Sequence, residues 1–333
     1  MEAKGKKKIT ATIIVIGLVF ISTILNRFSS RKYVSYKENR RSLFKFVLPE
    51  EIRFKQRFIA GDRDAEYIIG MIKIEGEITG HYEKYHSKSI SDIVKSALEK
   101  FKQDEKVKGI IIQINTPGGE IIEVEKIYEK IKEVKKTKPV IAVLENIATS
   151  GGYYCAVGAN RIISHPLTIT GNIGAIIVLY NVKELFEKKL GINVIIMKSG
   201  KYKDIASPFR IIDSEERRIL QNLVDQAGKR FLNVVIENRK ISEDKIKIIS
   251  DGRIFTGTEA REIGLIDELG TLQKAIDILK ELTKEKKLKV IEYYYRPNIF
   301  EILGIYQSEK FFISKISKIQ NTPILKYLWI PEI

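Results

Sequence analysis

The chain has 333 residues, of which 44% are hydrophobic and 30% are charged, a composition that supports one large folded domain or two small ones and excludes a disordered chain. Its formal net charge of +16 suits a nucleic acid or an anionic membrane surface as partner. The lysines, however, alternate with glutamates along helical stretches such as residues 125–138 and 280–290, which is typical of a solvated helix face, so we expect no nucleic-acid partner.

The N-terminus predicts a membrane anchor. A basic tail, residues 1–8, precedes the uncharged stretch 9–25, which is close to the lower length limit of a membrane-spanning helix. Because no small-x-small cleavage site follows, we interpret residues 9–25 as an uncleaved transmembrane anchor. Basic residues flank it on both sides, so the positive-inside rule leaves its orientation open. Residues 26–60 are basic and weakly periodic, and we interpret them as a membrane-proximal linker.

Strand and helix patterns alternate from Glu66 onwards. The predicted strands cover residues 66–78, 108–119 and 139–146, and the predicted helices cover residues 89–104, with Ser89 or Ser91 as N-cap, 123–136, and a small-residue stretch that begins after Ser150. This alternation predicts an α/β fold with a parallel sheet covered by helices. The single cysteine, Cys155, excludes an intrachain disulfide framework, and its place among small helical residues favours a core position.

The second half of the chain continues the pattern. Residues 160–180 are β-rich, 182–191 predict a short helix, 193–204 predict a strand that ends in a turn, and 214–240 predict a long helix capped by Ser214. Residues 252–282 add turns and two helices. The tail, residues 293–333, is aromatic and irregular, and we expect it to pack on its own domain or on a neighbour.

Two glycine-rich turns follow predicted strands. Pro117-Gly118-Gly119 ends one strand, and Ser150-Gly151 ends the next and opens a helix. Ligands of parallel sheets bind at the carboxyl ends of the strands, where the amides of Gly118 or Gly119 and of Gly151 can form an oxyanion hole beside a serine hydroxyl. Taken singly, the serine is most simply an N-cap and the glycines a turn. Their occurrence at successive strand ends favours a catalytic site.

A catalytic serine needs a base. The three histidines, His81, His86 and His165, lie in a polar loop or directly before a proline, and none has a convincing carboxylate partner. Lysine is the other known base, and it must be uncharged near pH 7, which requires burial to lower a lysine pKa by about three units. Lys203, between Tyr202 and Asp204 at the end of an apolar stretch, is the candidate.

The order of these motifs resembles signal peptide peptidase A, the membrane-anchored serine proteases of the S49 group. The resemblance covers about residues 66–280 and is carried by INTPGGE (114–120), by SGGYYCAVGANRIISHPLTITGNIGAI (150–176), by SGKYKD (199–204) and by FTGTEAREIGLIDELG (255–270). It implies a Clp protease/crotonase-like fold in a protease domain that we place at residues 61–292. It also implies Ser150 as nucleophile, Lys203 as general base, and Gly118 or Gly119 with Gly151 as oxyanion hole.

The same resemblance implies partners and a location. We expect a ring-shaped homo-oligomer in which serine and lysine come from adjacent protomers, and apolar peptides such as remnant signal peptides as substrates. The likeness of the N-terminus and of the closing residues 323–329 to short-form members implies a catalytic domain outside the cytoplasm. The mechanism requires no metal and no organic cofactor.

One position departs from the family pattern. Members usually carry serine where this chain has Asn172, and that serine is expected to orient the catalytic lysine; Asn172, Thr170 or Thr168 must take its place here. The departure leaves open a catalytically inactive scaffold that shapes membrane complexes. A crotonase-like acyl-CoA enzyme is the third alternative, with Glu120 as the carboxylate beside the oxyanion hole.

Overall fold

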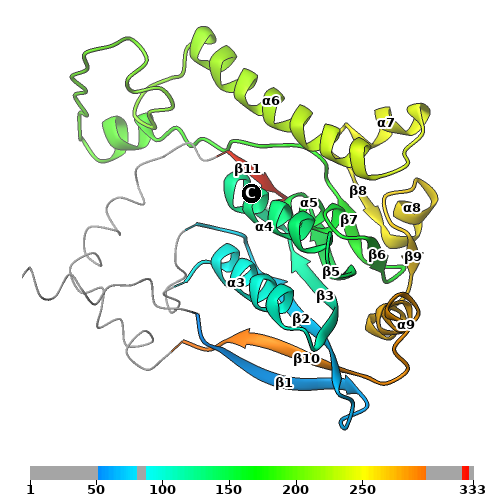
Figure 1. The fold of residues 1–333 in the computed structure, drawn as a ribbon. Coiled ribbons are helices and arrows are strands. Elements are labelled where there is room, and N and C mark those ends of the chain that lie inside the picture. Colours follow the sequence, from blue (N-terminus) through cyan, green and yellow to red (C-terminus); the bar gives the residue numbers. More distant parts are fainter. Residues whose placement is uncertain (1–51, 81–87, 298–324, 330–333) are drawn as a thin grey trace, which may run out of the picture. The chain divides into compact units, whose positions relative to one another are not determined.

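Apolar strands pair into one nine-stranded sheet in the computed structural model, which describes residues 52–80, 88–297 and 325–329 (Figure 1). Its strands are β1 (Phe54–Gly61), β2 (Tyr67–Glu75), β3 (Val107–Thr116), β5 (Val140–Thr149), β6 (Arg161–Ser164), β7 (Ile169–Gly171), β8 (Ile254–Thr256), β9 (Glu268–Leu269) and β10 (Leu288–Tyr295). A small second sheet joins β4 (Gly118–Glu120) to β11 (Lys326–Leu328). The helices are α3 (Ile90–Gln103), α4 (Ile121–Val134), α5 (Gly151–Val157), α6 (Ser214–Asn238), α7 (Glu243–Ile249), α8 (Gly257–Glu262), α9 (Leu272–Thr283) and a π-helical turn, Leu185–Lys189.

The main sheet runs in the order β1-β10-β2-β3-β5-β6-β9 and is parallel from β10 to β9. Only the outer strand β1 lies antiparallel to its neighbour β10 on this path. Helices connect the parallel strands, as crossover connections require. The predicted α/β class, a mostly parallel sheet flanked by helices, is therefore confirmed.

The core lies on both faces of this sheet. On one face, residues of β3 such as Ile110 and Ile112 pack in one cluster with α3, α4, α5 and α6. On the other face, the alternate residue Ile111 packs with α9. Strands covered on both faces need continuous apolar sequence, which explains the unbroken isoleucine run of β3. Cys155 is fully buried in the first cluster, and burial raises the pKa of its thiol, so the expected core position is confirmed.

The helix caps follow the sequence with one correction. Ser89 caps α3 and accepts a hydrogen bond from the amide of Asp92 at 3.1 Å. The cap of α6 is Asp213 rather than Ser214, because the carboxylate of Asp213 accepts from the amide of Glu216 at 2.8 Å while the Glu216 side chain accepts from the amide of Asp213. This capping box satisfies amides that the first helical turn leaves unpaired.

The strand predicted over residues 193–204 is absent. Residues 193–204 form irregular backbone and turns, and Ile195 and Met197 are 80% and 92% exposed. A strand needs a partner for its backbone groups, and this segment finds none among the described residues. β1, in turn, extends the sheet into the range that we interpreted as linker, since it pairs with β10.

The predicted anchor, residues 9–25, lies outside the described residues. Within the described ranges, no helix has the length and apolarity that crossing a bilayer demands.

Candidate active site

Ser150 sits in a strained turn between β5 and α5. Its φ of 52° and ψ of −118° lie in a region that residues with a side chain rarely adopt, and its amide donates to the carbonyl of Gly171 at 2.8 Å. The residue is 1% exposed, and its hydroxyl makes no capping bond to α5. Ser150 therefore occupies the N-cap position of α5, but its side chain does not cap the helix. A strained strand-to-helix turn of this kind holds a nucleophilic hydroxyl clear of its own helix.

The predicted glycines do come together beside Ser150. A Cβ atom built on Gly118 would lie 2.7 Å from the amide nitrogen of Gly151, although the two residues belong to different strand ends. The amide of Gly118 itself donates to the hydroxyl of Thr116 at 3.0 Å. Of the two candidates in the Pro-Gly-Gly turn, Gly118 thus has its amide bonded within the turn, whereas Gly119 pairs with β11. The sequence did not point to Thr116, because no local sequence pattern distinguishes a threonine whose hydroxyl supports a turn from one that simply ends a strand.

A peptide strand already lies in this site. β11 pairs antiparallel with β4, which places Tyr327 opposite Gly119 and Leu328 opposite Gly118. On its other edge, Lys326 exchanges two backbone hydrogen bonds with Ile176, at 3.0 and 3.1 Å. β11, red in Figure 1, also contacts α4 and α5. The site thus binds an extended segment by hydrogen bonds on both edges, which is strand addition.

Lys203 lies on an exposed turn, where its amide donates to the carbonyl of Gly200 at 3.1 Å. No hydrogen bond among the described residues joins it to Ser150, so the Ser150–Lys203 pair stays a prediction. Its neighbour Asp204 is held firmly: Arg210 Nε donates to Asp204 at 2.7 Å, and Arg210 Nη1 donates to Glu216 at 2.6 Å. The guanidinium lowers the pKa of both carboxyl groups through these bonds.

The three residues proposed to orient the lysine all donate to backbone carbonyls. Thr168 donates to Glu145 at 2.6 Å, Thr170 to Ala148 at 2.7 Å and the Asn172 amide to Gly252 at 2.7 Å. Asn172 also has a positive φ of 53°, a conformation that asparagine tolerates better than most residues. Their role toward Lys203 stays a prediction. The carboxylate of Glu120 accepts from the amide of Gly80 at 3.0 Å.

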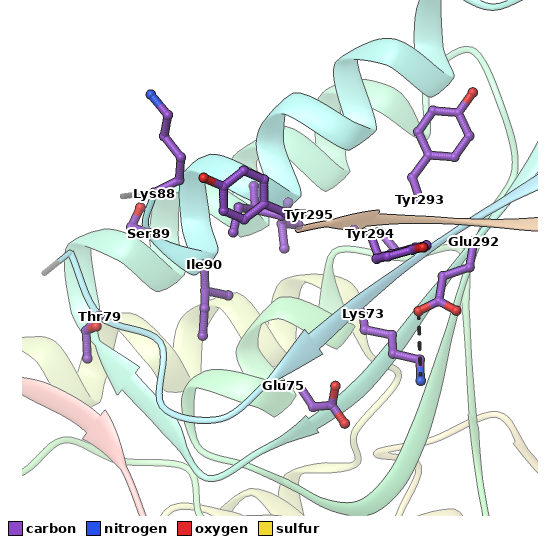
Figure 2. Close-up of a pocket in the computed structure, with 13 residues that line it drawn as sticks. Lys73, Glu75, Thr79, Lys88, Ser89, Ile90, Glu292, Tyr293, Tyr294 and Tyr295 are labelled. Atoms are coloured by element: carbon purple, nitrogen blue, oxygen red, sulfur yellow. Dashed lines mark ion pairs between the residues drawn. The ribbon is translucent and has the colours of Figure 1, made fainter. Parts of the chain in front are cut away.

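A separate cavity of about 250 Å³ lies between β2, the start of α3 and the end of β10 (Figure 2). Tyr293, Tyr294 and Tyr295 line it, and Lys73 and Glu292 form an ion pair of 3.9 Å at its edge. None of the predicted catalytic residues lines this cavity. The described residues contain no group of three or more histidine, cysteine, aspartate or glutamate side chains arranged to hold a metal ion.

Comparison with known proteins identifies the family. The model of peptidase family S49 matches residues 132–287, and the Clp protease model matches residues 67–170. A protein of Synechocystis named as a protease is 38% identical over 199 residues, which cover 60% of this chain and 70% of that protein. The chain belongs to peptidase family S49. The S49 match includes Ser150 and Lys203, and the Clp protease match includes both glycine turns.

Two further S49 relatives are similar over the same extent. A protein of Methanocaldococcus jannaschii named as a protease is 38% identical over 201 residues, 60% of this chain. A protein of Enterococcus faecium named as a signal peptide peptidase SppA is 40% identical over 200 residues, 59% of this chain. The matched stretch spans 64% and 57% of these two relatives' own lengths.

Proposed function

We propose that the chain is a serine endopeptidase in which Ser150 is the nucleophile and Lys203 the general base. The observation that carries the proposal is the buried, strained Ser150 beside the amide of Gly151, with a peptide strand paired alongside. Strain of this kind costs about 1–3 kcal/mol and persists where the surrounding structure enforces it, as in active sites. Membership of peptidase family S49 and the relatives named as proteases support the same activity.

The proposed reaction is acyl transfer to Ser150. Uncharged Lys203 accepts the hydroxyl proton while Oγ attacks the peptide carbonyl, and it then protonates the leaving amine. The amides of Gly119 and Gly151 donate to the oxyanion, each contributing about 3 kcal/mol to the stability of the transition state. Lys203 next activates a water molecule that hydrolyses the ester and frees the serine.

We place Lys203 beside Ser150 of a neighbouring copy in a ring-shaped homo-oligomer. Lys203 is exposed within one chain, so the burial that an uncharged amine needs has to come from a partner. The segment before it carries large exposed apolar side chains, with Leu190 at 55%, Ile195 at 80% and Met197 at 92%. Exposed apolar groups of this size are typical of protein interfaces.

The proposed substrates are extended, largely apolar peptides near a bilayer, including remnant signal peptides. Binding by strand addition, as β11 binds to β4, requires an extended substrate. The predicted anchor, residues 9–25, would hold the peptidase domain at the membrane on the extracytoplasmic side. The name of the Enterococcus faecium relative, a signal peptide peptidase, supports this class of substrate.

A fluorophosphonate probe tests the nucleophile. The probe is expected to label the full chain, because it bonds covalently to an activated serine. The Ser150→Ala variant is expected to show no labelling. Ser89→Ala is the matched control, because Ser89 is a buried serine that caps α3. This substitution is expected to lower the stability by about 1 kcal/mol and to leave the labelling of Ser150 unchanged. Persistent labelling of Ser150→Ala would reject the assignment. A folded wild-type oligomer that does not label would favour an inactive scaffold.

A further inference from the structure

Thr149 has the one buried side-chain polar atom that makes no hydrogen bond in the part of the chain that the structure describes. It is the last residue of β5, directly before Ser150, and it is fully buried. Buried hydroxyl groups almost always have a hydrogen-bond partner, because burial removes the water that would otherwise bond them. An unpaired hydroxyl beside the candidate nucleophile therefore needs an explanation.

The other threonines around the candidate site all use their hydroxyl groups. Thr168 and Thr170 each donate to a backbone carbonyl, at 2.6 and 2.7 Å. Thr116 donates to a backbone carbonyl as well, and it accepts a hydrogen bond from the amide of Gly118 at 3.0 Å. The lack of a hydrogen-bond partner is therefore particular to Thr149.

The neighbouring strands give Thr149 no side-chain partner. Its ladder partner in β7 is Gly171, which has no side chain, and the carbonyl of Gly171 already accepts from the amide of Ser150 at 2.8 Å. On the other side of β5, the ladder with β3 ends one residue earlier, where Thr116 pairs with Ala148. A hydrogen-bond partner for Thr149 thus has to come from outside the described residues.

A base that acts on Ser150 comes close to Thr149. Consecutive Cα atoms are only about 3.8 Å apart, so a single nitrogen atom can contact the hydroxyls of both residues. The proposed base is an uncharged amine, which has one lone pair to accept the Ser150 proton and two N–H groups that can donate. An acceptor for one N–H group fixes the direction of the lone pair, and Thr149 Oγ1 is an unused acceptor at this place.

Lys203 carries the matching unused donor. Its side chain is exposed, and its amine makes no hydrogen bond or ion pair among the described residues. In the ring-shaped homo-oligomer proposed above, Lys203 of a neighbouring copy is buried beside Ser150. A hydrogen bond from this amine to Thr149 satisfies two groups at once: a hydroxyl that is unpaired within one chain, and an amine that gives up its water on burial.

We infer that Thr149 is a positioning residue of the peptidase: its hydroxyl accepts a hydrogen bond from the Lys203 amine and directs the lone pair of that amine toward Ser150. This inference rests on the proposed function for its catalytic consequence, whereas the contact between Thr149 and Lys203 can be tested without catalysis. Two variants isolate the hydroxyl. Thr149→Val removes it and keeps the shape of the side chain, and Thr149→Ser keeps it and removes only a methyl group.

Thermal unfolding of the detergent-solubilised full chain tests the contact. In the Lys203→Ala chain the hydroxyl has no partner, so Thr149→Val is expected to raise Tm by about 2–4 °C, because a buried methyl group needs no hydrogen bond. With Lys203 present, the same change removes a hydrogen bond and is expected to leave Tm unchanged or to lower it. The control is Thr170→Val, which removes a bond of 2.7 Å to Ala148 and is expected to lower Tm in both chains. An equal effect of Thr149→Val in both chains would overturn the inference.

The kinetics of hydrolysis of an extended apolar peptide test the positioning role. Thr149→Val is expected to lower kcat about 10- to 100-fold and to keep KM within about twofold, because the base is present but misdirected. Thr149→Ser is expected to keep kcat within about threefold. An active wild type with a fully active Thr149→Val variant, or an equal loss in both variants, would reject the positioning role and leave the peptidase intact. A Tm effect that depends on Lys203 in a chain without any hydrolysis would support the contact and reject the peptidase.

Discussion

Gly118 and the carbonyl of Tyr327 share a space that no side chain can enter. A Cβ atom on Gly118 would lie 2.0 Å from the Tyr327 oxygen, and Gly118 has a φ of +108°, a conformation that a residue with a side chain rarely adopts. Position 118 thus requires glycine for two reasons: its backbone conformation, and the close approach of the β11 strand.

Gly118→Ala is therefore expected to displace the peptide strand and distort the oxyanion hole. We expect a loss of about 100-fold in the rate of peptide hydrolysis, because misplacing catalytic groups by about 1 Å has effects of this size. Gly174→Ala is the control, since in the described part of the chain no heavy atom beyond its two neighbours lies within 4 Å of its Cβ position. Steady-state kinetics of both variants check the prediction, and a wild-type rate for Gly118→Ala would contradict the placement of the site.

Mixing two inactive variants tests whether Lys203 acts on a neighbouring copy. Ser150→Ala and Lys203→Ala are each expected to be inactive alone. If serine and lysine come from different copies, equal mixing after dissociation and reassembly restores about a quarter of wild-type activity, because one interface in four combines an intact serine with an intact lysine. If both residues come from one chain, no mixture recovers activity. The rate of hydrolysis of an extended apolar peptide, measured before and after mixing, gives the answer.

Arg210 is expected to fix the turn that carries Lys203. Arg210→Ala leaves the carboxylate of Glu216, whose side chain is 1% exposed, without its cation, and we expect a loss of about 2–4 kcal/mol in stability. Arg210→Lys keeps the charge but lacks the planar guanidinium whose separate nitrogens bond Asp204 and Glu216, so we expect intermediate stability and a larger fall in kcat than in substrate affinity.

Thermal unfolding and steady-state kinetics measure both effects of Arg210. The control is Arg253→Ala, which breaks an exposed pair with Asp251 and is expected to leave the thermal unfolding midpoint close to that of the wild type. An Arg210→Ala chain as stable and as active as the wild type would show that the turn needs no such support.

Because of an ion-pair network between α3 and α4, the free energy of unfolding is expected to depend on pH in the acidic range. Lys102 and Lys130 donate to Glu133 at 2.5 and 2.9 Å and lower its pKa to about 2. A carboxyl group whose pKa is lower in the folded than in the unfolded state stabilises the fold above its unfolded pKa, about 4.5, and this contribution is lost as pH falls toward 2.

Glu133→Gln is therefore expected to lower the urea midpoint at pH 7 and to match the wild type near pH 2. Because the network is exposed, the difference at pH 7 is expected to shrink in 1 M salt. Glu262→Gln, at an exposed position, serves as control and should follow the wild type at every pH. A Glu133→Gln difference that is independent of pH would exclude the electrostatic explanation.

Local sequence patterns were sufficient for the elements whose interactions lie close together in the chain. The isoleucine run predicts β3, and the spacing of apolar residues predicts α3 and α4. Ser89 predicts the start of α3. These signals are local, because hydrophobic periodicity and helix capping involve residues only a few positions apart. The order of the motifs also predicted the family. The cap of α6 was misplaced by one residue because Asp213 and Ser214 are both good caps.

The sequence by itself thus determined the α/β class, the family, and Ser150 with its two glycine turns as the candidate site. Only the tertiary structure decided that the Gly118 amide is used by Thr116, that residues 193–204 form no strand, and that Tyr327 is buried against Tyr154 of α5. For Tyr327, the outcome depends on Tyr154 and Ala227, which lie at least 100 residues away in the chain. For Ile195, it depends on the lack of a strand partner among the described residues. Hydrogen bonds and packing between distant segments are set by the fold as a whole, and a local pattern carries no record of them.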